Sequence, residues 1–370
     1  MVVKLNIHTI KSKNVIEIYI TAVPRSHLSE NTRNEELFCG ISEALRQNNA
    51  HILQERIFIT EQARETAATL RAKIYNELDD GVSPTWLVGG GAGGSVVGIQ
   101  VHAIAECGAP EILKFNHMPC GRLARTPDMV YLTLSNIQRP AVPGQADQAM
   151  AMLQTAKSIL NDAGMDFRAA ARTWMWINDI LSWYNVFNQV RNSFFRECGI
   201  ITKSGQRRMP ASTGIGIHTG NGSVCTMELA AVAGRQSSIE YLDSGGNQKS
   251  AFNYGSAFSR GCKTRTPAGD TVYVSGTASI AADGRTMHSG DTRSQIEATI
   301  NNVLAVLEEF DYGEDDIVHA IAYCKTPQVK QMFIDGRYCL SWPIVVVIAD
   351  ICRDDLLFEI EVTAARDIET

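Results

Sequence analysis

Two glutamates near the end of the chain have the spacing of a candidate acid–base site. The stretch 344–366 is typical of a buried strand, a Cys-Arg-Asp-Asp turn and a second strand that carries Glu359 and Glu361. Side chains alternate across a strand, so both carboxylates point to the same face. A buried carboxyl is costly unless it has a partner, and one that stays protonated can act as a general acid. The alternative from pattern alone is an edge strand with a solvated acidic face.

The composition of the chain limits the classes of function. Its 370 residues, 45% hydrophobic and 20% charged, are typical of a soluble globular protein with room for two or three domains. The net charge of −6 argues against a general nucleic-acid binder, because there is no basic excess to displace counterions from phosphates. The apolar runs are too short to span a bilayer and no export signal is visible. We therefore expect a cytoplasmic protein with no membrane partner.

The cysteines and glycines predict neither a metal site nor a nucleotide site. The nine cysteines are scattered singly, without a Cys-x-x-Cys pair or a Cys/His cluster of zinc spacing, which indicates reduced thiols. The stretch 87–100 contains a formal G-x-G-x-x-G at Gly89, Gly91 and Gly94. A dinucleotide fingerprint needs a helix opening at the last glycine, whereas the following residues are typical of a strand. We expect a flexible loop that borders a strand.

A repeat supplies the elements that must position the glutamates. Residues 125–137 resemble residues 265–280, and each segment is typical of a strand that ends in a polar turn. An amphipathic helix with 3.6-residue periodicity follows each segment, at 145–163 and at 292–309. A further strand and a closing strand pair follow each helix, so the order β–α–β–(α)–β–β occurs twice.

The repeat divides the chain into three parts. Residues 1–117 have a pattern that is hard to interpret, residues 118–242 form one copy, and residues 251–370 form the other. The polar, glycine-rich segment 243–250 is typical of an interdomain connection.

The two copies differ at the candidate acid. When they are aligned, Glu361 pairs with Glu228, but Glu359 pairs with Thr226. This asymmetry indicates a degenerate copy at 118–242 and a catalytic copy at 251–370, and it favours Glu359 as the acid.

The repeated unit resembles the RidA/YjgF family, most specifically at FEIEV (358–362). The resemblance implies an α/β (α+β) fold of repeated, chorismate-mutase-like domains, with mixed sheets backed by helices. Such units normally associate in groups of three, which implies either an internal pseudo-trimer in a monomer or a homotrimer. In that family the first glutamate of the E-I-E strand lies in the ligand pocket, and it corresponds to Glu359. The imine deaminases of the family also use an arginine that neither copy carries, at Ile344 or near Ser212.

Most of residues 95–366 are similar to the chorismatases, which are single chains of YjgF-like domains. The similarity is carried by GIQVHAI (98–104), RTW (172–174), Tyr184 with FNQVR (187–191), PASTGIG (210–216), FSRG (258–261) and ADICRDDLLFEIE (349–361). It implies cleavage of the enolpyruvyl ether of chorismate with release of pyruvate and without a cofactor. Glu359 would protonate the methylene carbon, which requires an acid that keeps its proton near neutral pH.

Two positions resemble those of the chorismatases that form 3-hydroxybenzoate. These chorismatases are lyases of secondary metabolism. One is Cys352, seven residues before Glu359, and the other is a small residue that we align to Gly261. Cys352 would hold or deliver a proton, or would attack the ring transiently as a thiolate. The alternative for Cys352 is a buried packing residue. The other type in the family hydrolyses chorismate to a dihydroxy-cyclohexadiene carboxylate.

The two carboxylates of such a substrate require cations, and the planar fork of arginine matches them. We therefore expect substrate contacts from residues in the similar segments: Arg172, Tyr184, Arg191, Ser212, Thr213, Tyr254 and Arg260. Glu361 either raises the pKa of Glu359 by like-charge repulsion or only binds backbone or an arginine. The cluster Trp174, Met175, Trp176 and Trp183 is expected to be core.

Two rival functions remain open from the sequence. One is an imine or enamine-acid deaminase on the same fold. The other is a non-catalytic protein that binds a small carboxylic acid between its domains. All three hypotheses have a small-molecule ligand.

Overall fold

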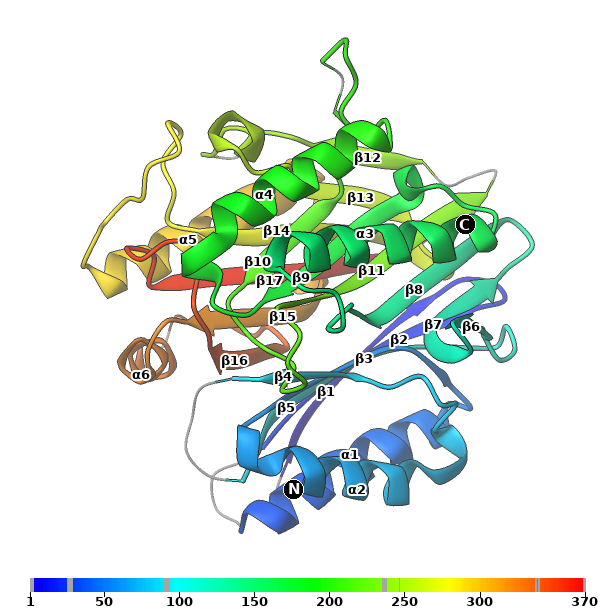
Figure 1. The fold of residues 1–370 in the computed structure, drawn as a ribbon. Coiled ribbons are helices and arrows are strands. Elements are labelled where there is room, and N and C mark those ends of the chain that lie inside the picture. The colour runs from blue at the N-terminus through cyan, green and yellow to red at the C-terminus, as the bar shows by residue number, and fades with distance from the viewer. Residues whose placement is uncertain are drawn as a thin grey trace.

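Three mixed β-sheets backed by helices make up the computed structural model of the chain (Figure 1). The sheets have five, six and six strands. The structure describes residues 3–24, 29–89, 94–205, 207–234, 238–245, 247–336, 338 and 340–368.

Each sheet and its helices come from a continuous part of the chain, which we call a unit. The first unit consists of β1 (Val3–Lys11), β2 (Ile16–Pro24), α1 (Glu30–Gln47), β3 (His51–Ile59), α2 (Arg64–Tyr75), β4 (Thr85–Val88) and β5 (Val96–Ala105). The second consists of β6 (Glu111–Phe115), β7 (Met118–Arg125), β8 (Met129–Ile137), α3 (Gln145–Asp162), β9 (Ala170–Ile177), α4 (Ile180–Glu197), β10 (Ala211–Ile215) and β11 (Cys225–Gly234). The third consists of β12 (Ile239–Leu242), β13 (Gly261–Arg265), β14 (Gly269–Ala278), α5 (Thr292–Glu308), β15 (Ile317–Cys324), α6 (Pro327–Asp335), β16 (Ile344–Ile348) and β17 (Phe358–Asp367).

The three units share one topology. The sheet orders are β1-β2-β5-β3-β4, β10-β9-β11-β8-β7-β6 and β12-β13-β14-β17-β15-β16, so the second and third sheets only add an outer strand, β6 or β12. In each unit the strand pair that flanks the second helix is parallel and the other neighbours are antiparallel. The repeat predicted twice therefore occurs three times, and the first unit is the copy that the sequence did not reveal.

Most elements predicted from the pattern are present, but the positions of two connections differ. The helices expected at 145–163 and 292–309 are α3 and α5. The segment 243–250 follows β12, which already pairs with β13, so the chain passes to the third sheet before that segment. Likewise β6 belongs to the second sheet, although the sequence places residues 111–117 in the N-terminal part. The strand expected after the glycines is β5, whereas Gly91 lies outside the described residues.

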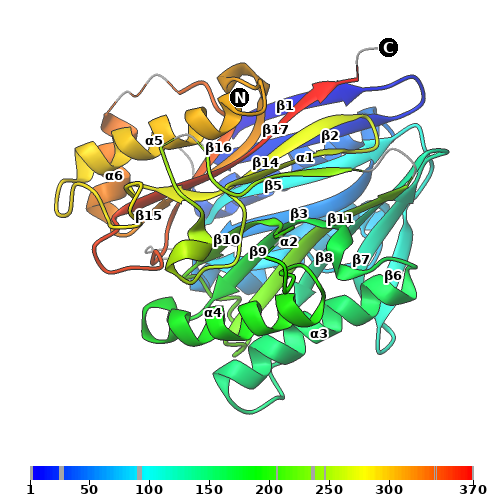
Figure 2. The same cartoon turned by 90° about the horizontal axis from the view of Figure 1, so that it is seen from above.

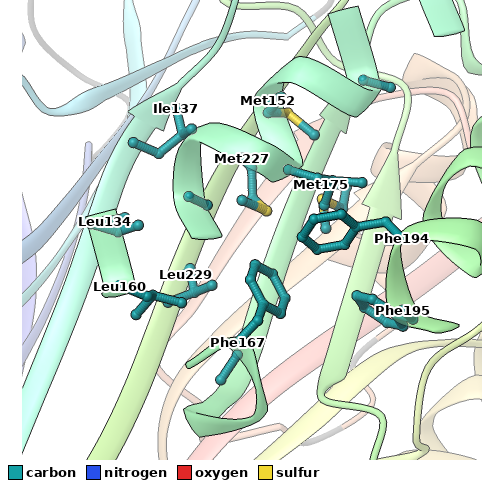
Figure 3. Close-up of a cluster of buried hydrophobic side chains, with 14 of the residues drawn as sticks. Leu134, Ile137, Met152, Leu160, Phe167, Met175, Phe194, Phe195, Met227 and Leu229 are labelled. Atoms are coloured by element: carbon teal, nitrogen blue, oxygen red, sulfur yellow. The ribbon is translucent and has the colours of Figure 1, made fainter. Parts of the chain in front are cut away.

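Helices cover the outer face of each sheet. Figure 3 shows the core beneath α3 and α4, where side chains from both helices pack on β8, β9 and β11. The face of α3 that its periodicity predicts, Ala149, Leu153, Ala156 and Leu160, is fully buried. Burying one leucine contributes about 1.5–3 kcal/mol, so this face fixes α3 on the sheet. The four residues of the tryptophan-rich cluster, Trp174, Met175, Trp176 and Trp183, are buried as expected.

The inner faces of the three sheets pack against one another. In Figure 2 the helix pair α5 and α6 and the pair α3 and α4 lie on opposite sides of the strands, and α1 and α2 lie behind them. Phe58, Trp176 and Tyr323 occupy equivalent positions in β3, β9 and β15. Their ring centroids are 6.4 Å (Phe58–Trp176) and 6.5 Å (Trp176–Tyr323) apart, so they meet where the three sheets converge. The units thus form an internal pseudo-trimer. No helix in the described part of the chain is both long and apolar enough to cross a membrane.

Candidate active site

The last strand of each unit has an equivalent register. Glu361 lies opposite Ile321 of β15, and Glu228 lies opposite Trp174 of β9. Two residues earlier along these strands, Glu359 lies opposite Tyr323. This register agrees with the pairing inferred from the sequence.

The first unit extends the comparison. At the position of Glu359, the second unit has Thr226 and the first has Gly98. At the position of Glu361, the first unit has Gln100. Of the three equivalent positions, only that of the third unit carries the candidate acid.

Glu359 lies in a cavity of about 110 Å³ between the second and third units. The second unit contributes side chains from α4 and β10, and the third contributes the segment before β13, the end of β14, the turn after β16 and β17. The lining residues are Tyr184, Asn185, Asn188, Ser212, Gly214, Tyr254, Ser256, Phe258, Arg260, Gly276, Ala278, Ile280, Cys352, Arg353 and Glu359. Five of the predicted site residues are among them besides Glu359: Tyr184, Ser212, Tyr254, Arg260 and Cys352.

Helix α4 and the turn before β17 are positioned by local contacts. Tyr184 and Asn188 are four residues apart on α4, so they share the face that borders the cavity. The turn is held from α5 by Gln295, whose Nε2 donates to the Asp355 carbonyl at 2.8 Å. Its Oε1 accepts from the Leu357 N–H, also at 2.8 Å. These contacts fix the segment that carries Cys352 and Arg353.

Two glycines give the cavity its shape. A Cβ on Gly276 would collide with Oε1 of Glu359 and would lie 3.0 Å from Cγ2 of Thr213. A Cβ on Gly214 would lie 3.3 Å from the hydroxyl of Tyr184. Only glycine leaves the backbone this close to the acid without displacing it.

The surroundings of Glu359 favour its protonated form. The side chain is 5% exposed, and its pKa is raised from 4.5 to about 8, with burial as the largest cause. The charge of Glu361 contributes to this rise, whereas Arg172 and Arg260 oppose it. A carboxyl with this pKa carries a proton at neutral pH and can give it up, which is what a general acid requires.

Glu361 is held by the neighbouring unit. Its Oε2 accepts from Nη2 of Arg172 and its Oε1 accepts from Nε1 of Trp174, both at 2.8 Å. Arg172 also donates to Oγ1 of Thr213 at 2.6 Å, and this oxygen accepts from the Gly276 N–H at 2.9 Å. Glu361 therefore binds an arginine and also contributes to the raised pKa of Glu359, so its role is not limited to binding the arginine.

This network gives Arg172 and Thr213 a different position from the one predicted. Both are almost fully buried and neither lines the cavity, because their polar groups join the two units. Their position does not support direct contact with a substrate. They support Glu361 and the backbone of Gly276 instead.

Two arginines border the cavity from the third unit. Arg260 donates from Nη2 to the hydroxyl of Tyr254 at 2.6 Å and to the Lys249 carbonyl at 2.8 Å. Arg353 donates from Nη1 to the Gly284 carbonyl at 2.7 Å. Both guanidinium groups lie near the Tyr254 ring, at 5.7 Å and 5.2 Å from its centroid. Arg353 is missing from the residues predicted as site, although it directly follows Cys352 in the most specific segment.

Arg191 and Gly261 lie behind the lining. Arg191 is buried between Phe187 and Phe258, and its Nη2 donates to Oδ1 of Asn188 at 2.6 Å. It therefore supports a lining residue. A Cβ on Gly261 would face α5, at 2.9 Å from Phe310. The position of Gly261 does not support contact with a ligand in the cavity, because Gly261 points to the opposite side from its neighbour Arg260.

Two polar groups that line the cavity beside Glu359, Cys352 and Tyr184, are neutral at neutral pH. Desolvation, with a smaller contribution from the nearby Glu359, raises the pKa of the Cys352 thiol to about 12. Burial also raises the pKa of Tyr184 to about 12. Cys352 is thus a thiol, which suits holding or delivering a proton and disfavours the thiolate attack that the sequence left open. Among the described residues no group of three or more His, Cys, Asp or Glu could hold a metal ion.

The other two interfaces are filled differently. Between the first and second units, Thr226 contacts the side chains of Gln138 and Thr219, and Trp86 occupies the position of Gly214. Between the third and first units, Gln100 donates to the Ala320 carbonyl at 2.9 Å. The interface of the second and third units differs in combining a carboxyl with two glycines.

Comparisons with known proteins agree with this architecture. The Endoribonuclease L-PSP family matches residues 249–366. A chorismatase of Streptomyces hygroscopicus is 28% identical over 250 residues, which is 62% of this chain and 70% of the relative. A chorismatase of Streptomyces rapamycinicus is 28% identical over 264 residues, which is 64% of this chain and 75% of that relative. A chorismatase crystal structure has a similar fold, with a TM-score of 0.62, 20% identity, and coverage of 85% of this chain and 93% of that one. The chain is therefore related to the chorismatases and has their RidA-like fold of repeated domains, as its sequence predicts.

Proposed function

We propose that the chain cleaves the enolpyruvyl ether of chorismate and releases pyruvate, with Glu359 as the general acid. The observation that carries the proposal is the buried carboxyl of Glu359, with a pKa of about 8, at the wall of a cavity between two units. The related proteins are chorismatases, which favours chorismate as the substrate.

Protonation of carbon is the demanding step of this reaction. Glu359 transfers its proton to the methylene carbon of the enolpyruvyl group, which becomes a methyl group. The positive charge then resides on the adjacent ether carbon as an oxocarbenium ion. Positioning a proton donor in this way contributes about 10²–10⁴-fold to a rate. The carboxylate left on Glu359 is close enough to stabilise the cation.

The two carboxylates of chorismate fit the two cavity arginines. Within the described part of the chain, Arg260 donates from Nε and Nη2 to protein groups, which leaves Nη1 for a ligand. Among the same residues, Arg353 uses Nη1 for the Gly284 carbonyl, which leaves Nε and Nη2. Each guanidinium therefore keeps donors for a carboxylate, and the Tyr254 ring between them provides an apolar surface.

We further propose 3-hydroxybenzoate as the second product. Its support is Cys352, whose neutral thiol lies beside Glu359 and has a proton to exchange. The sum of 3-hydroxybenzoic acid and pyruvic acid has the composition of chorismic acid, so this lyase reaction consumes no oxidant and no net water. Addition of water to the oxocarbenium ion would instead give the dihydroxy-cyclohexadiene carboxylate.

The test is to incubate the purified protein with chorismate, follow pyruvate in a coupled assay and identify the organic acid by chromatography. Pyruvate with 3-hydroxybenzoate supports both parts of the proposal. Pyruvate with the dihydroxy-cyclohexadiene acid keeps Glu359 as the acid and rejects the role of Cys352. Absence of pyruvate overturns the proposed activity and returns the choice to a deaminase or a binding protein.

A further inference from the structure

Glu361 occupies an unusual position for a buried carboxylate. It is 4% exposed and lies two residues from Glu359 on β17, so both side chains share one face of the strand. Both of its oxygens accept hydrogen bonds from β9 of the second unit, one from Arg172 and one from Trp174. We call this arrangement the clamp of Glu361. A donor on each oxygen fixes the position of this carboxyl beside Glu359.

A related arrangement occurs between the first and second units, without a catalytic acid beside it, although there only one oxygen of the carboxyl accepts the hydrogen bonds. Glu228 is fully buried, and its Oε2 accepts from Arg56 and from Nε2 of Gln54, the latter at 3.1 Å. Two residues before Glu228, the strand carries Thr226. Glu228 and Glu361 thus each join two units by accepting hydrogen bonds from side chains of the neighbouring unit. The clamp of Glu361 has an additional consequence, because its charge lies beside Glu359.

We propose that Glu361 is a positioning residue for Glu359: the clamp holds a fixed negative charge beside the acid, and this charge keeps Glu359 protonated until substrate is bound. The inference rests on the proposed function, which gives Glu359 a proton to deliver. It adds that the second unit sets the protonation of an acid in the third unit, through Arg172 and Trp174.

The other groups around Glu359 do not supply this charge. Arg172 of β9 and Arg260 before β13 are cations that favour the ionised acid. Tyr184 of α4 and Cys352 of the turn have pKa values of about 12, and that of Tyr323 on β15 is raised well above its ordinary value. These three groups are neutral near pH 7. Glu361 is the anion that opposes the two arginines.

The experiment measures the titration of Glu359 directly. Glutamate carboxyl carbons are labelled with ¹³C, and the resonance of Glu359 is assigned by its loss in Glu359→Gln. The titration is then compared between the native protein, Glu361→Gln and the control Glu228→Gln, which removes the corresponding buried carboxyl of the second unit. We expect Glu361→Gln to lower the pKa of Glu359 by about one unit or more, and Glu228→Gln to change it by no more than a few tenths.

The result that would overturn the inference is a shift in Glu361→Gln no larger than that in Glu228→Gln. This titration needs no substrate, so it stands or fails separately from activity on chorismate. If Glu361→Gln does not fold, the converse test uses Thr226→Glu, which places a carboxyl beside Glu228. The pKa of this new carboxyl should fall when Glu228→Gln is added, and an unchanged pKa contradicts the inference. In an active enzyme the alkaline limb of the pH–rate profile should shift with the pKa of Glu359.

Discussion

Replacing Glu359 by glutamine should make the folded protein more stable at alkaline pH while it removes the acid. Burial raises the pKa of Glu359 from 4.5 to about 8. The folded state therefore binds more protons at this site than the unfolded chain between these two pH values. Because of this difference, the free energy of unfolding falls as the pH rises through the window from 4.5 to about 8.

The size of the effect follows from the same two values. A rise from 4.5 to about 8 corresponds to a loss of about 5 kcal/mol once the pH exceeds the folded pKa. Glutamine is neutral at every pH and has nearly the same shape, so it does not incur this loss. The stability of Glu359→Gln relative to the native protein should therefore increase from pH 5 towards pH 8.5, by several kcal/mol at the upper end.

Urea unfolding followed by tryptophan fluorescence, at a series of pH values from about 5 to 9, measures this difference. Glu35→Gln is the control, because Glu35 is an exposed residue of α1 and its replacement should give a difference that does not change with pH over this range. A difference between Glu359→Gln and the native protein that stays constant from pH 5 to pH 8.5 would refute the reasoning. It would mean that Glu359 titrates in the folded state as it does in water.

Three further changes test individual parts of the site. Gly276→Ala adds a methyl group that collides with Glu359, so kcat for pyruvate release should fall about tenfold or more, and a kcat within twofold of native contradicts the geometry. Arg353→Gln removes a cation from the cavity and should raise KM for chorismate by about ten- to a hundredfold with a smaller change in kcat. If KM stays unchanged, Arg353 does not bind substrate. Cys352→Ala should retain pyruvate release but shift the second product from 3-hydroxybenzoate towards the dihydroxy-cyclohexadiene acid, whereas an unchanged product ratio, measured by chromatography, excludes a role for the thiol.

Local patterns were sufficient to predict the long helices α3 and α5 and the central strands of two units. The helix α3 is defined by an apolar face that recurs every three or four residues, and β17 by alternation, and both features depend only on neighbouring residues. The alternation also placed Glu359 and Glu361 on one face, in agreement with the regular pairing of β17 with β15 at these residues. The first unit was missed because its topology is fixed by backbone pairing and apolar alternation, which many sequences satisfy. Its β1–β2 turn has no counterpart of the Arg-Thr-Pro segment that relates the other two units.

The roles of individual polar residues depended on packing between units. Arg172 and Arg260 lie in equally similar segments, yet Arg172 is paired with a carboxylate of the next unit and Arg260 faces the cavity. No local pattern distinguishes them, because the partner of Arg172 is distant in sequence. Gly261 was predicted to be a site residue. It immediately follows the lining residue Arg260, and neighbouring residues of a strand point to opposite faces, so Gly261 points away from the cavity. Arg353 could have been found from its position between Cys352 and Glu359.

The central claim is that Glu359 donates the proton that cleaves the ether, and turnover by Glu359→Gln tests it most directly. Pyruvate release from chorismate is measured for the native protein and the variant, and the affinity of the variant for chorismate is measured by calorimetry. The account predicts that turnover falls by about 10²–10⁴-fold while affinity stays within a few-fold of that of the native protein. Pyruvate release by Glu359→Gln at a rate near that of the native protein would contradict it.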